Sequence, residues 1–550
     1  MLKKTIKIHP SDNVLVALVD LLHNETIHYE GNIISLIQEV PAKHKFTIQN
    51  IKKGNEVFMY GNIVGRATED IPKGCVITTQ NVEHATSSFG KKTSDYKNVT
   101  SLPDISKFKE RTFQGYLRKD GQVGTANYWL VIPLVFCENR NVEIIKEAFL
   151  EELGFNKPNP FKNLVKQMKK ALTIGEPSEI EELSLEGAKN IADNRFFENI
   201  DGIKFLTHQG GCGGTRQDSE MLCALLAGYL NNPNVAGGTV LSLGCQNAQI
   251  SLLEEKIKDI NKDFDKPLII LEQQQEGTEI ALLTKAIKNT FVGMAEANRL
   301  ERQEAPLSKL CIGLECGGSD GFSGISANPA VGHTSDLLVA LGGKTILSEF
   351  PELCGVEQEL INRCVDEQTA NKFAHLMKAY AASAAAVGSG FDMNPSPGNI
   401  KDGLITDAIK SAGAAKKGGT SAVADVLDYG EYVKKPGLNL LCTPGNDVES
   451  TTAMAGSGAN LILFTTGLGT PTGNPIAPVI KISSNSKLAQ RMPDIIDFNT
   501  GEIITGEKSI EETGENLLEL IIDVASGKVT PKAVALGQDD FIPWKRGVSL

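Results

Sequence analysis

Residues 313–329 read GLECGGSDGFSGISANP and place one cysteine, Cys316, among five glycines. The run follows KLCI, a short apolar segment of strand type, so Cys316 is expected where a strand ends and the backbone turns. Glycine lacks a Cβ and allows positive φ, which lets backbone amides and a neighbouring thiolate approach a ligand closely. The stretch therefore predicts a functional site at the end of a strand.

Shorter versions of this corner occur earlier in the chain. Cys212 in IKFLTHQGGCGG and Cys245 in GGTVLSLGCQNAQ each follow an apolar run, and the strand-like NYWLVIPLVFC ends at Cys137. Helical stretches such as DSEMLCALLAGYL separate these runs, which is typical of a parallel sheet with crossover helices. Since ligands of open α/β sheets bind at the carboxyl ends of the strands, we expect the corners to line a crevice.

The composition is that of a folded protein with several domains. At 550 residues the chain exceeds what one core usually supports, and its residues are 41% hydrophobic and 22% charged. A net charge of −12 argues against a nucleic-acid partner. No apolar stretch is long enough for a membrane span, and MLKKTIKIHPSDN lacks the apolar core of a signal peptide, so we expect a cytoplasmic protein. Ten cysteines are too sparse for a disulfide scaffold and should be reduced thiols.

Changes of pattern divide the chain into three units and a linker. Residues 1–88 hold short alternating segments typical of a small, mostly β module, and 89–110 are rich in Ser, Lys and Asp as in a linker. Residues 111–305 and 306–550 each read as an α/β domain with a mainly parallel sheet.

Two segments stand out from this division. SDNVLVALVDLL, residues 11–22, begins with a cluster of capping residues and predicts a helix inside the β module. The charged residues 151–195 predict a helical insertion in the central domain.

Short motifs identify a family. They are HPSDNVLVAL, KHKF, DGQVG, HQGGCGG, LGCQNAQ, LECGGSDGFSGISANP, SEFPE, NPSPGN and TPGND, in this order. Through them the chain resembles the altronate and galactarate dehydratases over nearly its whole length. The resemblance implies dehydration of a sugar acid, D-altronate first, to a 2-keto-3-deoxy acid in galacturonate catabolism. It also implies divalent iron as cofactor and an SAF domain at the N-terminus.

Two arginines of the family pattern are replaced. GTAN, residues 124–127, has Ala where the family usually has Arg before Asn127, and Leu468 stands where Arg often lies within the Thr-Gly-x-Gly-Thr-Pro motif. Arginine binds carboxylates through two parallel hydrogen bonds, which Ala and Leu cannot do. Asn127 is kept as a substrate-binding candidate, and Arg140 and Arg216 are candidates to replace the lost arginines.

Dehydration of a 2,3-dihydroxy acid requires removal of the proton beside the carboxylate and loss of hydroxide from the next carbon. A divalent cation can stabilise the enediolate and the departing hydroxide together. The first candidate ligand set is Cys212, Cys245 and Cys316, joined by Cys137, because soft thiolates suit iron. These thiolates could hold one Fe2+ or an iron–sulfur cluster. Alternatively, their glycine loops only place amides around the sugar acid.

The second candidate set lies in the N-terminal module. His9 and Asp12 flank the start of the predicted helix, and His44 lies in the basic turn Lys43-His44-Lys45. Imidazole and carboxylate suit a divalent metal, although a histidine could instead shuttle protons and Asp12 could be an ordinary N-cap.

For the base, His208 is the first candidate because it ends a strand-like run four residues before Cys212. His44 and a desolvated Lys45 are the other candidates. The structural alternative for His208 is an imidazole that hydrogen-bonds its own glycine-rich loop.

Polar residues in the predicted strand-end loops could bind the polyol. They are Gln274, Glu315, Ser319, Asp320, Ser323, Asn328, Asn399, Asn446 and Asp447. Asn and Asp beside Gly are also common turn formers, so some of them have that role instead.

Other functions fit the sequence less well. No strand leads into a clean GxGxxG motif, so a nicotinamide cofactor is not expected. A carbohydrate-binding protein would leave the cysteine corners without a role. Galactarate dehydratases and sulfolactate sulfo-lyases would use the same proton abstraction, and both stay open, as does homo-oligomerisation.

Overall fold

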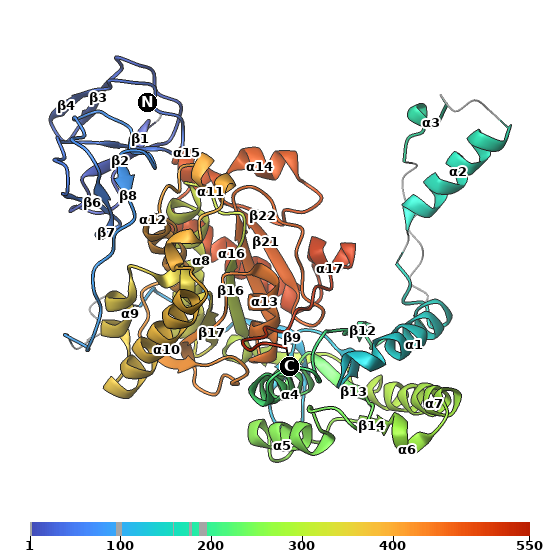
Figure 1. The fold of residues 1–550 in the computed structure, drawn as a ribbon. Helices are drawn as coiled ribbons and strands as arrows, with labels where there is room; N and C mark the ends of the chain where they lie inside the picture. Colours follow the sequence, from blue (N-terminus) through green and yellow to red (C-terminus); the bar gives the residue numbers. More distant parts are fainter. Residues whose placement is uncertain (1–2, 95–101, 158, 175–178, 186–194, 550) are drawn as a thin grey trace.

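The computed structural model describes residues 3–94, 102–157, 159–174, 179–185 and 195–549 (Figure 1). Positions 95–101 of the predicted linker and parts of the predicted insertion lie outside these ranges. The fold is mixed α/β, with a small β module followed by two regions built on parallel sheets, so the predicted fold class is confirmed. No helix of the described residues is long and apolar enough to cross a membrane.

The N-terminal module consists of three small antiparallel sheets. One has the order β1-β2-β5, one pairs β3 with β4, and one has the order β6-β7-β8. The strands are β1 (Thr5–Ile6), β2 (Val14–Ala17), β3 (Thr26–Tyr29), β4 (Asn32–Ser35), β5 (Lys45–Thr47), β6 (Glu56–Met59), β7 (Asn62–Ala67) and β8 (Val82–Glu83).

The helix predicted for residues 11–22 is wrong, because this segment contains strand β2. All four β2 residues are buried, so the strand has no polar face to reveal its period of two. Val14 and Val16 pack into one apolar cluster, whereas Leu15 and Ala17 pack into another. The continuous apolar run therefore resembled a buried helix.

The central region holds a four-stranded parallel sheet of order β12-β11-β13-β14. The strands are β11 (Tyr128–Pro133), β12 (Gly202–Phe205), β13 (Val235–Ser242) and β14 (Leu268–Glu272). Helices α4 (Arg216–Asn231) and α5 (Ile250–Ile260) share an apolar cluster with one face of the sheet. Helices α1 (Asn139–Glu152) and α7 (Glu279–Ala297) share a second cluster with the other face. Strands β9 (Thr112–Leu117), β10 (Val123–Gly124) and β15 (Gln303–Pro306) form a separate antiparallel sheet.

The C-terminal region holds a seven-stranded parallel sheet of order β18-β19-β17-β16-β20-β21-β22. The strands are β16 (Cys311–Cys316), β17 (Lys344–Leu347), β18 (Val423–Leu427), β19 (Gly437–Leu441), β20 (Leu461–Thr466), β21 (Val479–Ser483) and β22 (Phe498–Asn499). Helices α8 (Ala327–Ala340) and α16 (Ile510–Ala525) pack on one face, and α13 (Asp447–Gly456) packs on the other. Its remaining helices are α9 (Glu357–Arg363), α10 (Glu367–Ala386), α11 (Pro397–Lys401), α12 (Asp407–Ala414), α14 (Ser486–Arg491), α15 (Gly501–Thr505) and α17 (Lys532–Leu536).

The strand order reverses at the centre of this sheet. The chain runs from β16 to β17 on one side and later returns to β20 on the other side of β16. In open α/β sheets, ligands bind at the carboxyl ends of the strands beside such a reversal.

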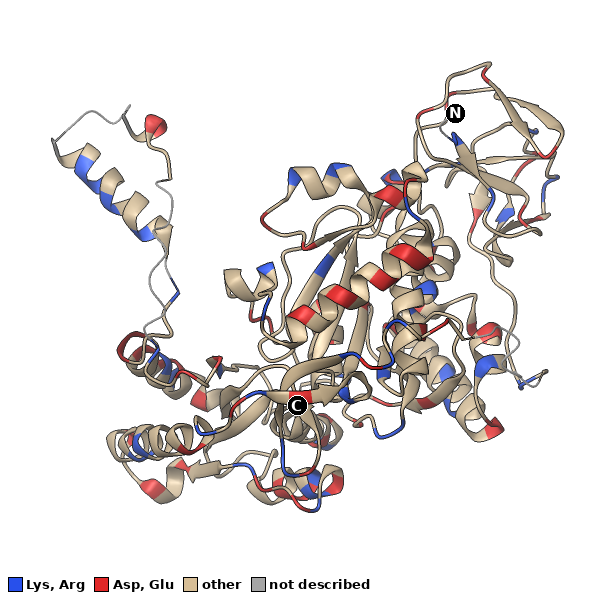
Figure 2. Ribbon diagram, turned by 180° about the vertical axis from the view of Figure 1, so that it is seen from behind, with Lys and Arg blue, Asp and Glu red and all other residues tan. Residues whose placement is uncertain are grey.

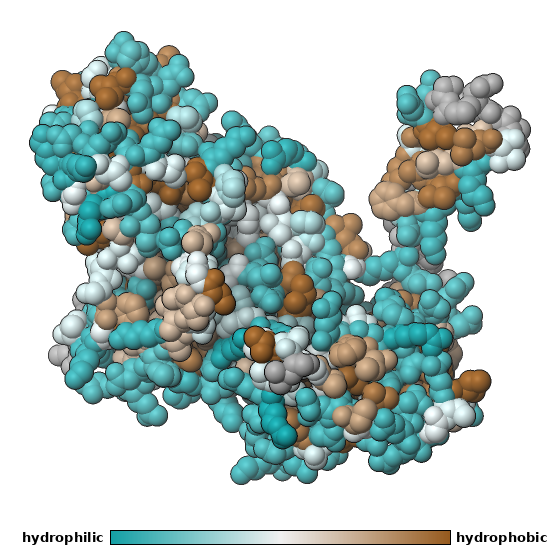
Figure 3. Space-filling model, viewed as in Figure 1, coloured by the Kyte–Doolittle hydropathy of each residue, from teal (hydrophilic) through white to brown (hydrophobic). Residues whose placement is uncertain are grey.

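The predicted insertion contributes α2 (Pro160–Ile174) and α3 (Glu179–Glu182), which project from the central region as an arm (Figure 1). Phe161, Val165 and Leu172 of α2 are exposed apolar residues (Figure 3), and lysines occupy other positions of the same helix (Figure 2).

Candidate active site

A group of buried carboxylates surrounds Cys316 at the carboxyl end of β16. Glu315 and Cys316 are the last residues of that strand, and Glu349 and Glu352 come from the turn after the neighbouring β17. Asp447 begins α13, after β19. We call Glu315, Cys316, Glu349, Glu352 and Asp447 the thiol–carboxylate cluster. All but the half-buried Asp447 are at most 2% exposed.

Glu349 links the two halves of the cluster. Cys316 Sγ lies 3.2 Å from Glu352 Oε2 and 3.6 Å from Glu349 Oε2. On the other side, ligand atoms of Glu315, Glu349 and Asp447 lie within 4.8 Å of one another. The φ angle of Glu349 is 64°, in the left-handed region that non-glycine residues rarely adopt. Such backbone strain persists only where the surrounding structure enforces it, often at functional sites.

Two buried carboxylate oxygens of the cluster have no partner. Glu315 Oε2 accepts a 2.6 Å hydrogen bond from Ser450 Oγ, but Glu315 Oε1 has no hydrogen-bond partner. Glu349 Oε1 likewise receives no hydrogen bond from a donor group, and the two glutamates contact each other, which two charged carboxylates can do only with a proton or a cation between them. Leaving a buried acceptor unsatisfied costs about 1–3 kcal/mol, and more for a charged group. A cation between these oxygens would remove that cost.

Two lysines pair with the carboxylates, and a third is buried close enough to interact with Asp447 and Glu315. Lys417, in the 3-10 helix η6 (Ala415–Gly418), lies 2.9 Å from Glu349 Oε2, and Lys410 of α12 lies 2.6 Å from Glu352 Oε1. Lys481 of β21 is 0% exposed, and its Nζ lies 3.4 Å from the centroid of the Phe464 ring without a hydrogen-bond partner.

Burial dominates the protonation of these groups. It raises the pKa of Asp447 to about 7, helped by Glu349 and Glu352, and it lowers the pKa of Lys481 to about 7. Burial and the Glu349 carboxylate raise the pKa of Glu315 well above its usual value. Burial also raises the pKa of the Cys316 thiol, as do Glu349 and Glu352. Without a cation, protons therefore occupy part of this cluster at neutral pH.

The donor set fits a divalent transition metal. Among the described residues, Cys316–Glu349–Glu352 and Glu315–Glu349–Asp447 are two of the groups with the spacing to hold a metal ion. A thiolate among carboxylates suits ions such as Fe2+ and Zn2+, whereas the three carboxylates alone also suit Mg2+ and Mn2+. Gly317 leaves space for this arrangement, since a Cβ at that position would overlap the Asp447 carboxylate.

Several predicted polyol-binding residues lie around the cluster. Asp320 Oδ1 accepts hydrogen bonds from Ser323 and Ser484, at 2.9 and 2.8 Å. Asn399 Nδ2 donates a 2.8 Å hydrogen bond to the Ser319 carbonyl. Asn328 accepts a hydrogen bond from Thr465 Oγ1 and donates one to the Gly413 carbonyl. Asn446 is exposed and caps α13.

The basic turn of the N-terminal module contacts these loops. Lys43 Nζ lies 3.1 Å from Asp320 Oδ2 and 2.9 Å from Asp402 Oδ1. Lys45 is buried and donates a 2.6 Å hydrogen bond to the Gly403 carbonyl, and burial lowers its pKa to about 7. His44 is half-buried, and burial lowers its pKa.

His9 and Asp12 lie elsewhere in the module. The Asp12 oxygens accept hydrogen bonds from the backbone N–H groups of His9 and Gly61, both at 2.9 Å, so this carboxylate braces a turn. His9 is exposed, and its Nδ1 lies 2.7 Å from Ser11 Oγ.

The other predicted cysteine ligands do not join Cys316. Cys137, Cys212 and Cys245 follow β11, β12 and β13, so they lie at the carboxyl edge of the four-stranded sheet, as expected. All three are exposed, and none belongs to a group of metal-ligand spacing among the described residues. Cys316 ends a strand of the other sheet.

His208 lies in a pocket of about 510 Å³ beside Cys212, with Asp218, Trp544 and Lys545 in its wall. Its Nδ1 accepts a 3.1 Å hydrogen bond from the Gly210 N–H, and its Nε2 lies 2.7 Å from the Pro133 carbonyl oxygen. Burial lowers its pKa to about 4. Both ring nitrogens thus contact backbone groups. This arrangement favours the alternative in which His208 is an imidazole that hydrogen-bonds its own glycine-rich loop.

The remaining predicted residues are spread over the central region. Arg140 is exposed and pairs with Glu279 at 2.7 Å, and Arg216 is exposed at the start of α4. Asn127 is fully buried before β11, at the opposite edge of the sheet from the cysteines, and its amide donates to the Asn199 carbonyl at 2.7 Å. Gln274 follows β14 and lies close to Gly244, next to Cys245.

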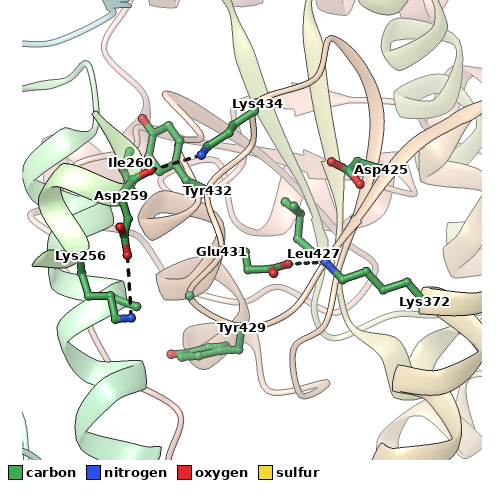
Figure 4. A pocket seen from close by; sticks show the side chains of 12 residues that line it. Lys256, Asp259, Ile260, Lys372, Asp425, Leu427, Tyr429, Glu431, Tyr432 and Lys434 are labelled. Atoms are coloured by element: carbon green, nitrogen blue, oxygen red, sulfur yellow. Dashed lines mark hydrogen bonds and ion pairs between the residues drawn. The ribbon is translucent and has the colours of Figure 1, made fainter. Parts of the chain in front are cut away.

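A second pocket, of about 480 Å³, opens beside α5 (Figure 4). Lys372 pairs with Glu431 at 2.6 Å, and Lys434 Nζ donates to the Asp259 carbonyl at 3.3 Å. These charged side chains pair with groups of the pocket wall and do not point toward one common position where a ligand could be held.

Five residues of this site were not predicted from the sequence: Glu349, Glu352, Lys410, Lys417 and Lys481. SEFPE was recognised as a motif, and its position directly after a strand is the signal that could have identified both glutamates. The three lysines come from helical and strand segments without such a signal.

Comparisons with known proteins agree with this architecture. Residues 3–85 match the model of the altronate/galactarate dehydratase SAF domain, and residues 115–298 match that of the D-galactarate dehydratase/altronate hydrolase second domain. Residues 307–549 match the D-galactarate/altronate dehydratase C-terminal model. Each model covers one of the regions described above.

Three curated proteins are similar over nearly the whole chain. Altronate dehydratase of Escherichia coli K12 is 34% identical and that of Bacillus subtilis 168 is 33% identical, each over 96% of both chains. Galactarate dehydratase (L-threo-forming) of E. coli K12 is 31% identical over 95% of this chain and 93% of its own.

Proposed function

The chain belongs to the D-galactarate/altronate dehydratase family and is a hydro-lyase, and we propose that it converts D-altronate to 2-dehydro-3-deoxy-D-gluconate and water. The proposal places the reaction at the thiol–carboxylate cluster. The observation that carries it is the pair of unpartnered buried oxygens, Glu315 Oε1 and Glu349 Oε1, at the strand reversal of a parallel sheet. The 34% and 33% identity to two altronate dehydratases favours altronate over galactarate.

We infer that Fe2+ is the cofactor and that Glu315, Glu349 and Asp447 hold it, with Cys316 beside them. Bound there, a divalent cation supplies positive charge to the substrate carboxylate and to the leaving hydroxide. Glu349 is the residue common to both groups of ligand spacing, and Lys417 holds its carboxylate through the 2.9 Å contact with Oε2. The half-buried Asp447 is the ligand nearest to solvent, so substrate would enter on its side.

We assign the base to Lys481. Its pKa of about 7 leaves a substantial neutral fraction at neutral pH, and its Nζ has no other partner. Lys410 is unsuited, because the Glu352 carboxylate overcomes the effect of burial and raises its pKa. Lys45 and His44, at the module contact, are the alternatives, and His208 is a third.

The loops around the cluster supply groups for the polyol. We propose that Ser319, Asp320, Asn399 and Asn446 lie near the substrate hydroxyls, with Lys43 holding Asp320 in place.

Because all ten cysteines are free, a reducing compartment is favoured, and we propose a cytoplasmic enzyme of galacturonate catabolism.

The proposal is tested by an assay under anaerobic conditions. The purified protein is first loaded with Fe2+. It is then assayed with D-altronate, galactarate and sulfolactate in separate reactions, and 2-keto acid formation is measured. Keto acid from D-altronate at the highest kcat/KM is expected. A higher kcat/KM on galactarate or sulfolactate would reassign the substrate, and no keto acid from any of the three would refute a sugar-acid lyase.

A further inference from the structure

A second group of potential ligands lies where the N-terminal module meets the C-terminal region. His84 follows β8, the last strand of the module, Cys354 follows the 3-10 helix η4 (Phe350–Leu353), and Asp407 begins α12. Their ligand atoms lie within 4.8 Å of one another. The mechanism proposed above uses none of the three.

Two of these side chains each contain a buried atom that receives no hydrogen bond from the surrounding protein. Asp407 is 0% exposed, and its Oδ1 accepts a 3.1 Å hydrogen bond from Asn394 Nδ2, whereas its Oδ2 has no hydrogen-bond partner outside this group, in which the Cys354 thiol interacts with the Asp407 carboxylate. His84 Nδ1 is also buried without a partner. A carboxylate oxygen and an imidazole nitrogen without partners outside the group thus lie beside a buried thiol, and burial without such partners costs free energy.

The surrounding charges leave room for a cation. Three carboxylates on neighbouring segments, Asp392, Glu357 and Glu352, interact electrostatically with this group. The cation that interacts with Asp407 is Lys410. Lys410 already pairs with Glu352 at 2.6 Å. Burial raises the pKa of Asp407 to about 8 and lowers that of His84, so both groups are largely neutral without a ligand.

We propose that His84, Cys354 and Asp407 form a second metal site, which binds one zinc-class transition-metal dication. Nitrogen, sulfur and oxygen donors together match Zn2+ and its relatives, and three protein ligands leave a fourth position for water. The site joins the module to α12, beside a contact in which Thr406 Oγ1 donates to the Val64 carbonyl at 2.7 Å.

The site would also communicate with the thiol–carboxylate cluster. Asn394 donates to Asp407 through Nδ2, and its Oδ1 accepts a 3.3 Å hydrogen bond from Lys410, which pairs with Glu352. Metal binding at Asp407 would hold Asn394 in place, and through it Lys410 and Glu352.

The test is Co2+ binding to the full-length apoprotein, because Co2+ bound to a thiolate has a charge-transfer absorption band in the near ultraviolet. Wild type, Cys354→Ala, His84→Ala and Asp407→Asn are compared by equilibrium dialysis and absorption. Each variant should bind one Co2+ fewer than wild type, and Cys354→Ala should lose intensity in the band. Cys364→Ala removes another buried cysteine of the same region and should match wild type.

Asp407→Asn keeps the shape of the side chain, so it tests the proposal even if the other variants unfold. Glu349→Gln separates the two sites, because it should lose the metal of the thiol–carboxylate cluster and retain the Cys354-dependent band. Wild-type Co2+ stoichiometry and an unchanged band in Cys354→Ala and Asp407→Asn would overturn the second site, whatever the dehydratase assay shows.

Discussion

Lys417 Nζ lies 2.7 Å from Cys316 Sγ, which joins the end of β16 to a helical turn 101 residues later in the chain. The same ammonium lies 2.9 Å from Glu349. Burial alone would lower the pKa of Lys417, but Cys316, Glu349 and Glu352 raise it well above its usual value. Lys417 is therefore a permanent positive charge in contact with Cys316 and Glu349.

Lys417→Met should destabilise the protein and weaken metal binding. The substitution leaves the Glu349 carboxylate buried beside Cys316 without its counter-ion, which costs about 3–5 kcal/mol for a broken buried pair. Metal affinity should fall about 10- to 100-fold, as for loss of a group that orients ligands. Urea unfolding and Fe2+ titration measure both effects. The adjacent Lys416→Met is the control, and equal behaviour of the two variants would contradict this role.

Cys316→Ala and Cys245→Ala distinguish the two sheets as metal sites. If the cluster on β16 is the active site, Cys316→Ala should reduce kcat at least about 10-fold and lower the iron content, because it removes a group next to the metal. Cys245 is exposed in the central region, so its removal should leave both near wild type. The opposite pattern would return the metal to the cysteines of the four-stranded sheet.

The pH dependence of kcat/KM should follow Lys481. A base must be neutral, so activity should rise as the pH increases through about 7 and reach a plateau above it. Asp447, with a pKa of about 7, acts in the same direction because it must lose a proton to bind the metal. Lys481→Met should reduce kcat at least about 100-fold with iron retained. The exposed Lys487→Met serves as the control, and a wild-type rate in Lys481→Met would move the base to Lys45 or His44.

Lys481 should also shape the pH dependence of stability. Its pKa is lower in the folded protein than in the unfolded chain, so between about pH 7 and 10.5 the unfolded chain binds the additional proton. The free energy of unfolding should therefore gain a rising contribution across this window. Denaturant unfolding of wild type and Lys481→Met at pH 7 and 9 measures it, and the same pH dependence in both proteins would contradict a buried neutral lysine.

The contact between the N-terminal module and the C-terminal region should depend on Asp320. This carboxylate is fully buried and pairs with Lys43 at 3.1 Å. Asp320→Ala should cost about 3–5 kcal/mol, because it leaves the buried Ser323 and Ser484 hydroxyls without their acceptor and removes the buried partner of Lys43. Asp402→Ala removes the more exposed partner of Lys43 and should cost no more than about 1 kcal/mol. Comparable losses in the two variants would argue against Asp320 as the anchor.

The sequence predicted the positions of strand ends better than the composition of the site. The run 313–329 indicated a functional corner, and the structure places Cys316 at the end of a central strand. The same reasoning grouped Cys316 with Cys212 and Cys245 although they fall in different predicted domains, because a strand-end pattern does not give the distance between the edges of two sheets. Lys410 and Lys417 reach the cluster through tertiary packing, which no local sequence pattern predicts. The left-handed backbone at Glu349 was also not predictable, because such a conformation is usually indicated by a glycine. The buried strand β2 was mistaken for a helix because both of its faces are apolar.

The position of the metal is the most direct test of the account. Crystals grown anaerobically with Fe2+ and measured at the iron absorption edge would give an anomalous difference peak at each bound iron. The account predicts a peak bounded by Glu315, Glu349 and Asp447, next to Cys316, which disappears in Glu349→Gln. An iron peak at Cys137, Cys212 and Cys245, with none at Glu349, would contradict it.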